Sequence, residues 1–156
     1  MRRDWRTVAI FAIPVVVAFS LFSCEVDKST TPDGTGDGTA SYTLDGGSAT
    51  ISGRTFTASG NDQSAILVTN GGNLNLRDSS ISTTGNTSSE DNSSSYGLNA
   101  AVLAQAGGSI SLSGCAITTR GAGASGVFAT GSSSSVTMMN GTIICAGKSA
   151  HGVGAG

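Results

Sequence analysis

The sequence predicts an all-β domain built as a parallel β-helix of about four coils, over residues 42–156. Two observations predict this fold: an internal repeat with a period near 25 residues, and apolar residues that alternate within each repeat as they do along a strand. The composition agrees, because 23 of the 156 residues are glycine and only 12% are charged. Glycine together with Ser, Thr and Asn favours turns and polar strands over helices.

The repeat consists of four segments that align without gaps at their centres. Apolar residues occupy the first, third and eighth positions of each segment, and a glycine closes it. The four segments are residues 49–60, 74–85, 110–121 and 136–147. Stacked coils would bury these apolar positions in one narrow core, so Phe56, at an eighth position, is expected to be a core residue.

A second apolar strand precedes three of the segments. These strands are residues 65–68, 101–104 and 126–129, and residues 152–155 begin a further one. Phe128 aligns with Leu67 and Leu103 and therefore follows an apolar column. Hydrogen bonds between coils would then run between parallel strands, which leaves the many Ser, Thr and Asn side chains on the outside.

One repeat is longer than the others. Successive eighth positions lie at 56, 81, 117 and 143, so the steps are 25, 36 and 26 residues. The long step contains residues 86–96, which are rich in serine, and we expect a loop of about ten extra residues there. Its Glu90, Asp91 and Tyr96 are the candidate ligand contacts, although Tyr96 could instead pack at the base of the loop.

Residues 101–112 (AVLAQAGGSISL) and 126–131 (GVFATG) resemble coils of right-handed parallel β-helix proteins. Within the pectate-lyase-like fold, they are most similar to autotransporter-passenger and adhesin-like chains. The resemblance covers roughly residues 44–156. It implies the fold but not an activity, because different functions are built on such scaffolds.

The N-terminus has the pattern of an export signal. A basic start, Met1–Arg6, precedes 16 uncharged and mainly apolar residues, 7–22, which are fewer than the roughly 20 of a membrane-spanning helix. Leu21-Phe22-Ser23-Cys24 resembles the lipobox of bacterial lipoproteins, in which the cysteine receives the lipid, although Phe22 stands where a small residue is usual. We therefore expect residues 1–23 to be a signal peptide and Cys24 to be lipidated; an uncleaved membrane anchor is the alternative.

Residues 24–41 hold little that could be buried and are expected to form a flexible linker after the lipid. The resemblance to lipoproteins implies an exported, membrane-anchored protein, and Glu25 after the cysteine favours the outer membrane or the cell surface. The last coil begins at Gly152 and the sequence stops at Gly156, which leaves an uncovered coil edge. We expect a truncated chain; an end covered by a partner is the alternative.

The sequence offers little that could carry catalysis or bind a metal or cofactor. Cys115 lies two residues before Ile117, whereas Cys145 lies two after Ile143. This offset separates the two cysteines by about 13 Å along the strands, too far for a disulfide, so we expect two separate thiols. His151 is the only histidine, and we expect it in a surface turn.

The charged residues also fail to form a catalytic pattern. The repeat region holds Asp45, Asp62 and Asp78, and no two acids occupy matching positions on adjacent coils. Arg77 aligns with Ser113 and Arg120 with Thr84, so the arginines do not stack. From Cys24 onward nine acidic residues oppose five basic ones, a net charge of −4, and nucleic acid is therefore an unfavourable partner.

The function expected from these features is that of a lipid-anchored, non-enzymatic, adhesin-like protein of the cell surface or periplasm. Its partners would be the membrane, through the lipid, and a carbohydrate or protein bound at the polar coil faces. The alternative is a fragment of a β-helical polysaccharide lyase or glycoside hydrolase, which would need an acid cluster on one face. A spacer that holds something away from the membrane is the third alternative.

Overall fold

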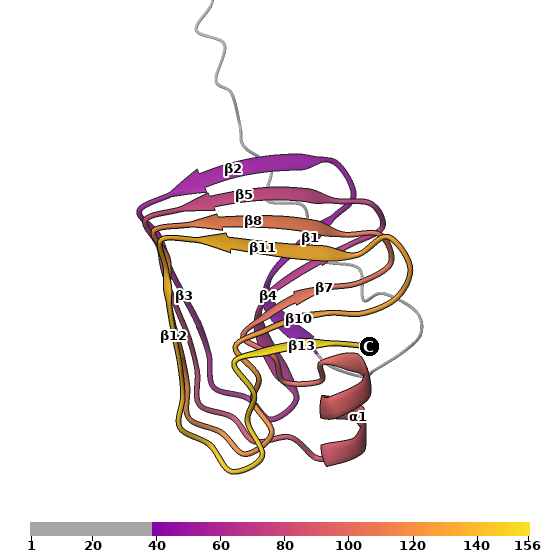
Figure 1. Ribbon diagram of the computed structural model, residues 1–156, viewed down its shortest axis with the longest axis vertical. Coiled ribbons are helices and arrows are strands. Elements are labelled where there is room, and N and C mark those ends of the chain that lie inside the picture. Colours follow the sequence, from indigo (N-terminus) through magenta and orange to yellow (C-terminus); the bar gives the residue numbers. More distant parts are fainter. Residues whose placement is uncertain (1–38) are drawn as a thin grey trace, which may run out of the picture.

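The computed structural model describes residues 39–156, and these form a parallel β-solenoid of about four turns (Figure 1). Each full turn contributes one strand to each of three sheets, and every strand pair is parallel. The predicted signal peptide (1–23), the predicted lipid site Cys24 and the predicted linker up to residue 38 lie outside the described residues. The fold prediction is therefore confirmed at the level of a mainly β, parallel solenoid.

Three sheets make up the solenoid, and we call them A, B and C. Sheet A contains β1 (Thr39–Asp45), β4 (Gln63–Thr69), β7 (Val102–Ala104), β10 (Val127–Ala129) and β13 (Val153–Ala155) in that order. Sheet B contains β2 (Ser48–Ser52), β5 (Asn73–Arg77), β8 (Ser109–Ser113) and β11 (Ser135–Met139). Sheet C contains β3 (Thr55–Ala58), β6 (Ser80–Thr83), β9 (Ala116–Thr119) and β12 (Thr142–Cys145).

The strand register confirms the repeat found in the sequence. The first and third positions of the segments form two columns in sheet B, and the eighth positions form one in sheet C. These columns are Ala49, Leu74, Ile110, Val136; Ile51, Leu76, Leu112, Met138; and Phe56, Ile81, Ile117, Ile143. They point inward because strand side chains alternate between the two faces of a sheet.

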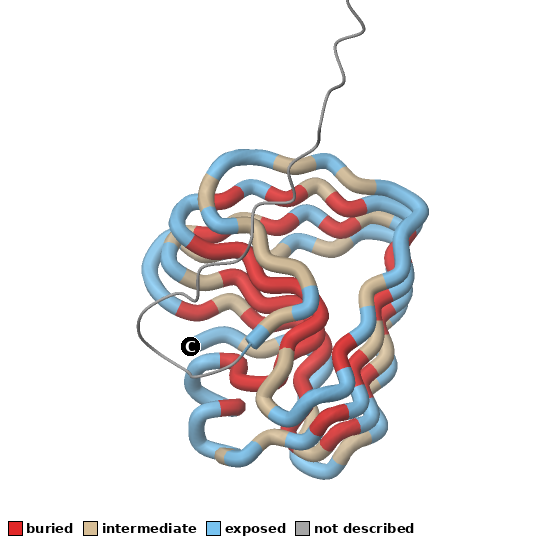
Figure 2. The backbone as a smooth tube through the Cα atoms, turned by 180° about the vertical axis from the view of Figure 1, so that it is seen from behind, coloured by how far each residue is buried: buried red, intermediate tan, exposed pale blue. Residues whose placement is uncertain are grey.

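Burial of the core depends on the position of the coil in the stack. The members of these columns in the two inner coils are buried, for example Leu74 and Ile81. Their counterparts at the two ends, for example Phe56 and Ile143, are only partly buried (Figure 2). Phe56 is thus part of the core as expected, but it lies in the first coil, where other described residues cover it on one side only.

The first coil starts earlier than the sequence indicated. β1 begins at Thr39, so residues 39–41, assigned to the linker from the sequence, belong to a strand. Tyr42 and Leu44 lie beside Ile66 and Val68 and extend the inward apolar columns of sheet A. The Tyr42 ring also meets the ring of Phe56 edge to face, with the ring centroids 5.5 Å apart.

The sequence predicted that the 86–96 insertion is a loop. The structure corrects this, because residues Glu90–Tyr96 form helix α1. Local capping explains the helix. The Ser89 side chain accepts a hydrogen bond from the Asn92 backbone N–H at 3.2 Å, and Gly97 ends the helix in the left-handed conformation. Glu90 and Asp91 occupy the first turn, where negative charge is favourable. The domain is therefore mostly β rather than all-β.

α1 lies beside the outer face of sheet A near the last strand of that sheet (Figure 1). A small apolar cluster outside the main core contains Leu67, Ala100, Leu103 and Phe128. Phe128 follows its apolar column as expected, but that column belongs to this outer cluster and not to the interior of the coils. The Ser93 hydroxyl donates a hydrogen bond to the Gly123 carbonyl and connects α1 to the next coil.

Candidate functional site

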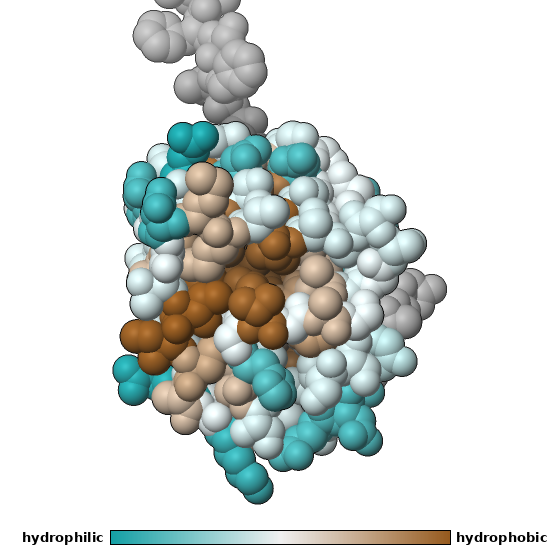
Figure 3. All heavy atoms as spheres, in the orientation of Figure 1, coloured by the Kyte–Doolittle hydropathy of each residue, from teal (hydrophilic) through white to brown (hydrophobic). Residues whose placement is uncertain are grey.

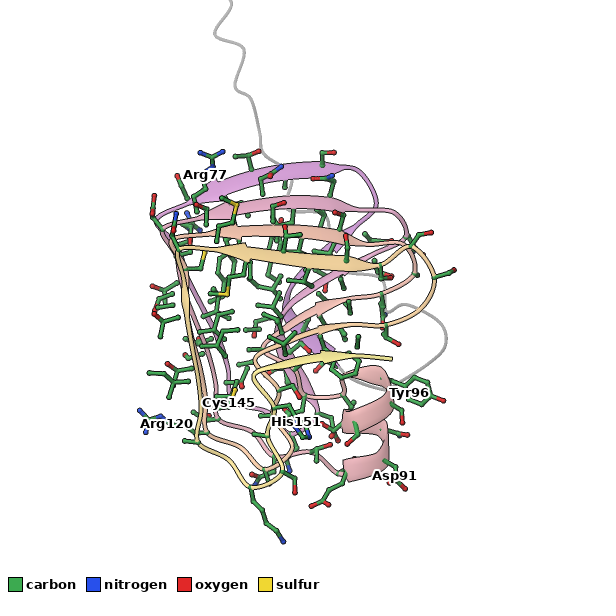
Figure 4. All side chains as sticks on the ribbon, viewed as in Figure 1. Arg77, Asp91, Tyr96, Arg120, Cys145 and His151 are labelled. Atoms are coloured by element: carbon green, nitrogen blue, oxygen red, sulfur yellow. The ribbon has the colours of Figure 1, made fainter. Side chains whose placement is uncertain are left out.

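The outer face of sheet B is a regular array of mainly small polar side chains, interrupted at its third column by Arg77 and Met139, and we call it the polar face. Its members alternate with the inward apolar residues and are exposed or partly exposed. Coil by coil, they are Ser48, Thr50, Ser52; Asn73, Asn75, Arg77; Ser109, Ser111, Ser113; and Ser135, Thr137, Met139. Arg77 projects outward from the edge of this sheet (Figure 4).

The geometry of the polar face follows from the strand register. Residues in one column, such as Thr50, Asn75, Ser111 and Thr137, lie on adjacent parallel strands. Adjacent strands are about 4.8 Å apart, and successive outward residues along one strand are about 6.6 Å apart. The polar face is therefore a two-dimensional grid of hydrogen-bonding groups at nearly constant spacing.

Only some of these side chains bond to each other. The hydroxyl oxygens of Ser111 and Thr137 lie 3.2 Å apart, and Ser135 donates to Ser109 at 3.2 Å. Asn75 donates from Nδ2 to Asn73 Oδ1 at 3.4 Å. A hydroxyl can donate one hydrogen bond and accept two, so groups paired in this way keep capacity for an external ligand.

Sheet C offers a smaller and less uniform outer surface. Its outward positions hold Thr55, Thr57, Ser80, Ser82, Ala116, Thr118, Thr142 and Ile144. Ala116 and Ile144 interrupt the polar pattern, and each strand supplies two outward positions where sheet B supplies three. Sheet B is therefore the broader candidate surface for a polar ligand.

The residues singled out from the sequence as ligand contacts all lie on α1. Glu90 and Asp91 are in its first turn, and Tyr96 is its last residue, with 43% of its surface exposed. Tyr96 comes five positions after Asp91, which is about 7.5 Å along a helix. They project from opposite ends of the helix (Figure 4), so they do not form one compact cluster. Their role as contacts stays a prediction.

Two acids of the repeat region, Asp45 and Asp62, have structural partners. Asp45 Oδ1 accepts a hydrogen bond from Asn70 Nδ2 at 2.5 Å. Asp62 Oδ1 accepts from the Ser88 backbone N–H at 2.7 Å and holds the start of the insertion. Within residues 39–156, no group of three or more His, Cys, Asp and Glu side chains could hold a metal ion. The hydrogen bonds of Asp45 and Asp62 indicate that these two carboxylates support turns.

The two described cysteines are free thiols, which confirms the prediction of two separate thiols. Cys115 is buried, and its Sγ lies 3.6 Å from the Leu76 carbonyl oxygen. Cys145 is partly exposed in the last full coil, and its Sγ lies 3.3 Å from the His151 carbonyl oxygen. His151 itself is exposed, as expected, in the connection between β12 and β13.

Arg77 and Arg120 lie apart, as the alignment predicted. Arg77 pairs in register with Ser113, and Arg120 lies at a different corner of the coil (Figure 4). The polar face therefore carries a single positive charge near one side.

Sequence reasoning named the polar coil faces only in general terms. The outward positions between the first and third apolar residues of each repeat were the signal that could have identified sheet B.

Comparisons of the chain with protein-family models, with curated proteins and with solved structures gave no match. Within residues 39–156, the helical part of the fold is too short and too polar to cross a membrane. Functional inference therefore depends on the geometry and chemistry of the solenoid surface.

Proposed function

We propose that the protein is a non-enzymatic, lipid-anchored, adhesin-like β-helix protein of the cell surface or periplasm. In this proposal the helix is right-handed and of the pectate-lyase-like type, and the polar face of sheet B binds carbohydrate. The observation that carries the proposal is the grid of Ser, Thr and Asn side chains at register positions across four coils.

Carbohydrate fits this grid because of its own chemistry. A polysaccharide presents hydroxyl groups at regular intervals, and each hydroxyl both donates and accepts hydrogen bonds. The hydroxyl and amide groups of the polar face do the same, and their spacing repeats from coil to coil. A repeated ligand can therefore meet several weak sites at once, and binding strength comes from their number.

The lipid anchor in this proposal rests on Leu21-Phe22-Ser23-Cys24 and the apolar segment before it. Lipidation would hold the protein at the membrane, and the polar face would bind the ligand. Palmitate labelling of the full chain in bacterial cells tests this step. We expect label on the wild type, loss of label in Cys24→Ser, and retained label in the control Cys115→Ser. Equal labelling of Cys24→Ser would contradict the anchor.

A catalytic role has weaker support. The acids at Asp45 and Asp62 bind turn residues of the protein itself, and they lie at corners outside the polar face. A fragment of a polysaccharide lyase or hydrolase remains the second candidate because such enzymes share this kind of scaffold. Product release from a panel of acidic polysaccharides by the purified full chain would overturn the non-enzymatic proposal.

Binding of the full chain, purified in mild detergent, to an array of bacterial and host glycans tests the main proposal. Ser111→Lys places a long charged side chain near the centre of the polar face and is expected to lower binding at least tenfold. Ala116→Lys, an exposed change in the same coil on sheet C, is the matched control and should bind as the wild type does. Binding to no glycan, or equal loss in both variants, would refute a carbohydrate site on sheet B.

A further inference from the structure

The sequence contains two Asn-Gly pairs, and both lie in exposed corners of the solenoid. Asn70-Gly71 follows β4, in the corner between sheets A and B, and Asn140-Gly141 joins β11 to β12, in the corner between sheets B and C. All four residues are exposed, and the two asparagines are left-handed with nearly equal φ angles, 51° and 52°. The pairs thus agree in sequence, exposure and φ, but they differ in their hydrogen bonds.

An Asn-Gly pair can react with itself in water, and asparagine is among the thermolabile residues for this reason. The backbone nitrogen of the glycine loses its proton to a base in the solvent and attacks Cγ of the asparagine. The Cγ–Nδ2 bond breaks, Nδ2 takes up a proton and leaves as ammonia, and a five-membered succinimide forms. Glycine permits the attack because it has no Cβ to obstruct it. The reaction therefore needs a free asparagine amide and a free N–H after it.

Neither group is free at Asn70-Gly71. The Gly71 backbone N–H donates a hydrogen bond to the Ala106 carbonyl oxygen at 3.0 Å. The Asn70 side chain donates from Nδ2 to Asp45 Oδ1 at 2.5 Å. Asp45 ends β1 in the preceding coil and Ala106 follows β7 in the next one, so the coils on both sides hold this pair. The attack has to wait for local opening of both bonds, which slows it.

Both groups are free at Asn140-Gly141. Among residues 39–156, no group forms a hydrogen bond with the Asn140 side chain or with the Gly141 N–H. Packing requires the glycine, because a Cβ there would stand 2.6 Å from the Cys115 carbonyl oxygen. The fold therefore keeps at this corner the one residue type that leaves the attack unobstructed.

The free N–H is a property of this corner and recurs in the inner coils. Each coil joins sheet B to sheet C through two residues, which are Gly53-Arg54, Asp78-Ser79, Gly114-Cys115 and Asn140-Gly141. No backbone carbonyl accepts from the second residue of any of these pairs. Only the Arg54 N–H has a partner, the Ser79 side-chain oxygen at 3.1 Å.

Exposure at this corner is likewise independent of the coil. Asp78 and Gly114 occupy the position of Asn140 in the two inner coils, and both are exposed although a coil lies on either side. Hydrophilic residues gather on the surface where β11 leads into β12 (Figure 3). Water and a solvent base therefore reach the side chain at this position.

We propose that Asn140 is a site of spontaneous deamidation, with water as the second reactant, and that Asn70 is protected from it. Water opens the succinimide at either of its two carbonyl groups and leaves aspartate or isoaspartate. The aspartate fits the fold, because Asp78 stands at the same position in the second coil. The isoaspartate adds a methylene group to the main chain and strains a connection of only two residues. Either product adds a negative charge beside Met139, at the edge of the polar face, and this proposal is independent of the proposed carbohydrate site.

Rates of conversion at the two asparagines test the proposal. The purified full chain is incubated at mildly alkaline pH, and peptide mapping by mass spectrometry locates each amide that has become an acid. We expect Asn140 to convert at least tenfold faster than Asn70 in the folded protein. In concentrated urea the two should convert at similar rates, because the hydrogen bonds that protect Asn70 are then lost. Equal rates in the folded protein, or faster conversion of Asn70, would overturn the proposal.

A glycine variant provides the matched control. Asn140→Gly should fold as the wild type does, because Gly53 and Gly114 stand at the same position in other coils and are also left-handed. On isoelectric focusing, the wild type and Asn70→Gly should both form a more acidic species during the incubation, and Asn140→Gly should not form it at that rate. Formation of the acidic species at the wild-type rate in Asn140→Gly would place the reaction elsewhere and refute the assignment.

Discussion

The ring of Phe128 lies directly against Gly97, the residue that ends α1. A Cβ atom added at Gly97 would stand 2.6 Å from Phe128 Cγ, closer than side-chain atoms approach in proteins. On another side, a Cβ at Gly154 of β13 would stand 2.4 Å from the same ring. The outward Phe128 is thus enclosed by two glycines, and this contact seats the insertion on sheet A.

Gly97→Ala should therefore destabilise the protein by more than the cost of placing an alanine in the left-handed conformation. Gly97 and Gly71 have nearly equal backbone angles, φ 71° and 72°, but Gly71 has open space around its Cβ position. Gly71→Ala should cost about 1 kcal/mol for the left-handed conformation, and Gly97→Ala about 2–4 kcal/mol because overpacking adds to it. Urea denaturation of both variants measures the difference, and equal costs would show that Phe128 moves freely.

Shortening a side chain in the inward apolar column of sheet C should lower stability by different amounts in different coils. Ile81 is 1% exposed in an inner coil, whereas Ile143 is only partly buried in the last full coil. Ile81→Ala should lower the free energy of unfolding by about 2–5 kcal/mol, and Ile143→Ala by about half as much or less. Thermal or urea unfolding at low protein concentration tests this. An equal loss at both sites would mean that the last coil is as well covered as the inner ones.

Tyr42 should make the protein sensitive to alkaline pH. Burial of its phenol raises the pKa of Tyr42 above the usual value, because the charged form is poorly solvated there. The unfolded chain then ionises at a lower pH, near about 10, so the stability associated with neutral Tyr42 is complete below that pH and is lost as pH rises through the folded pKa. Tyr42→Phe should abolish that part of the pH dependence in unfolding titrations, and an unchanged profile would contradict it.

The two described thiols should differ in their reactivity. Cys115 is 1% exposed in an inner coil, and Cys145 is partly exposed. A thiol-specific alkylating reagent should modify Cys145 in the native protein and Cys115 only after unfolding, because access limits the reaction. Peptide mapping by mass spectrometry locates the label. Intact mass without reductant should show no loss of two protons, and such a loss would reveal a disulfide.

Sequence reasoning located the columns of the solenoid but not all of its elements. The pairs Leu76–Leu112 and Ile81–Ile117 followed from the repeat alone, since each coil must place apolar residues at the same positions to build a continuous core. β1 was missed in part because Thr39–Ser41 are small and only Ala40 among them is apolar. They become strand because they pair with β4, and their own side chains give no signal of it.

The candidate site, like the fold, was predicted only in part from the sequence. The sequence by itself determined that Ser, Thr and Asn alternate with the apolar residues of each coil, and this alternation sends them outward because the side chains of a strand have a period of two. Only the tertiary structure decided that sheet B supplies three outward positions on each strand and sheet C two, because that depends on where each strand begins and ends.

Helix α1 was likewise decided by tertiary structure. Residues 86–96 contain almost no apolar side chains, so their pattern has no helical period to detect. A seven-residue helix is too short to be stable alone, and it persists here because Ser93 bonds to Gly123 and Gly97 rests on Phe128. The sequence determined where the coils repeat, because each coil must place apolar residues at the same positions to build a continuous core. Contacts with other coils decided that Glu90–Tyr96 form a helix.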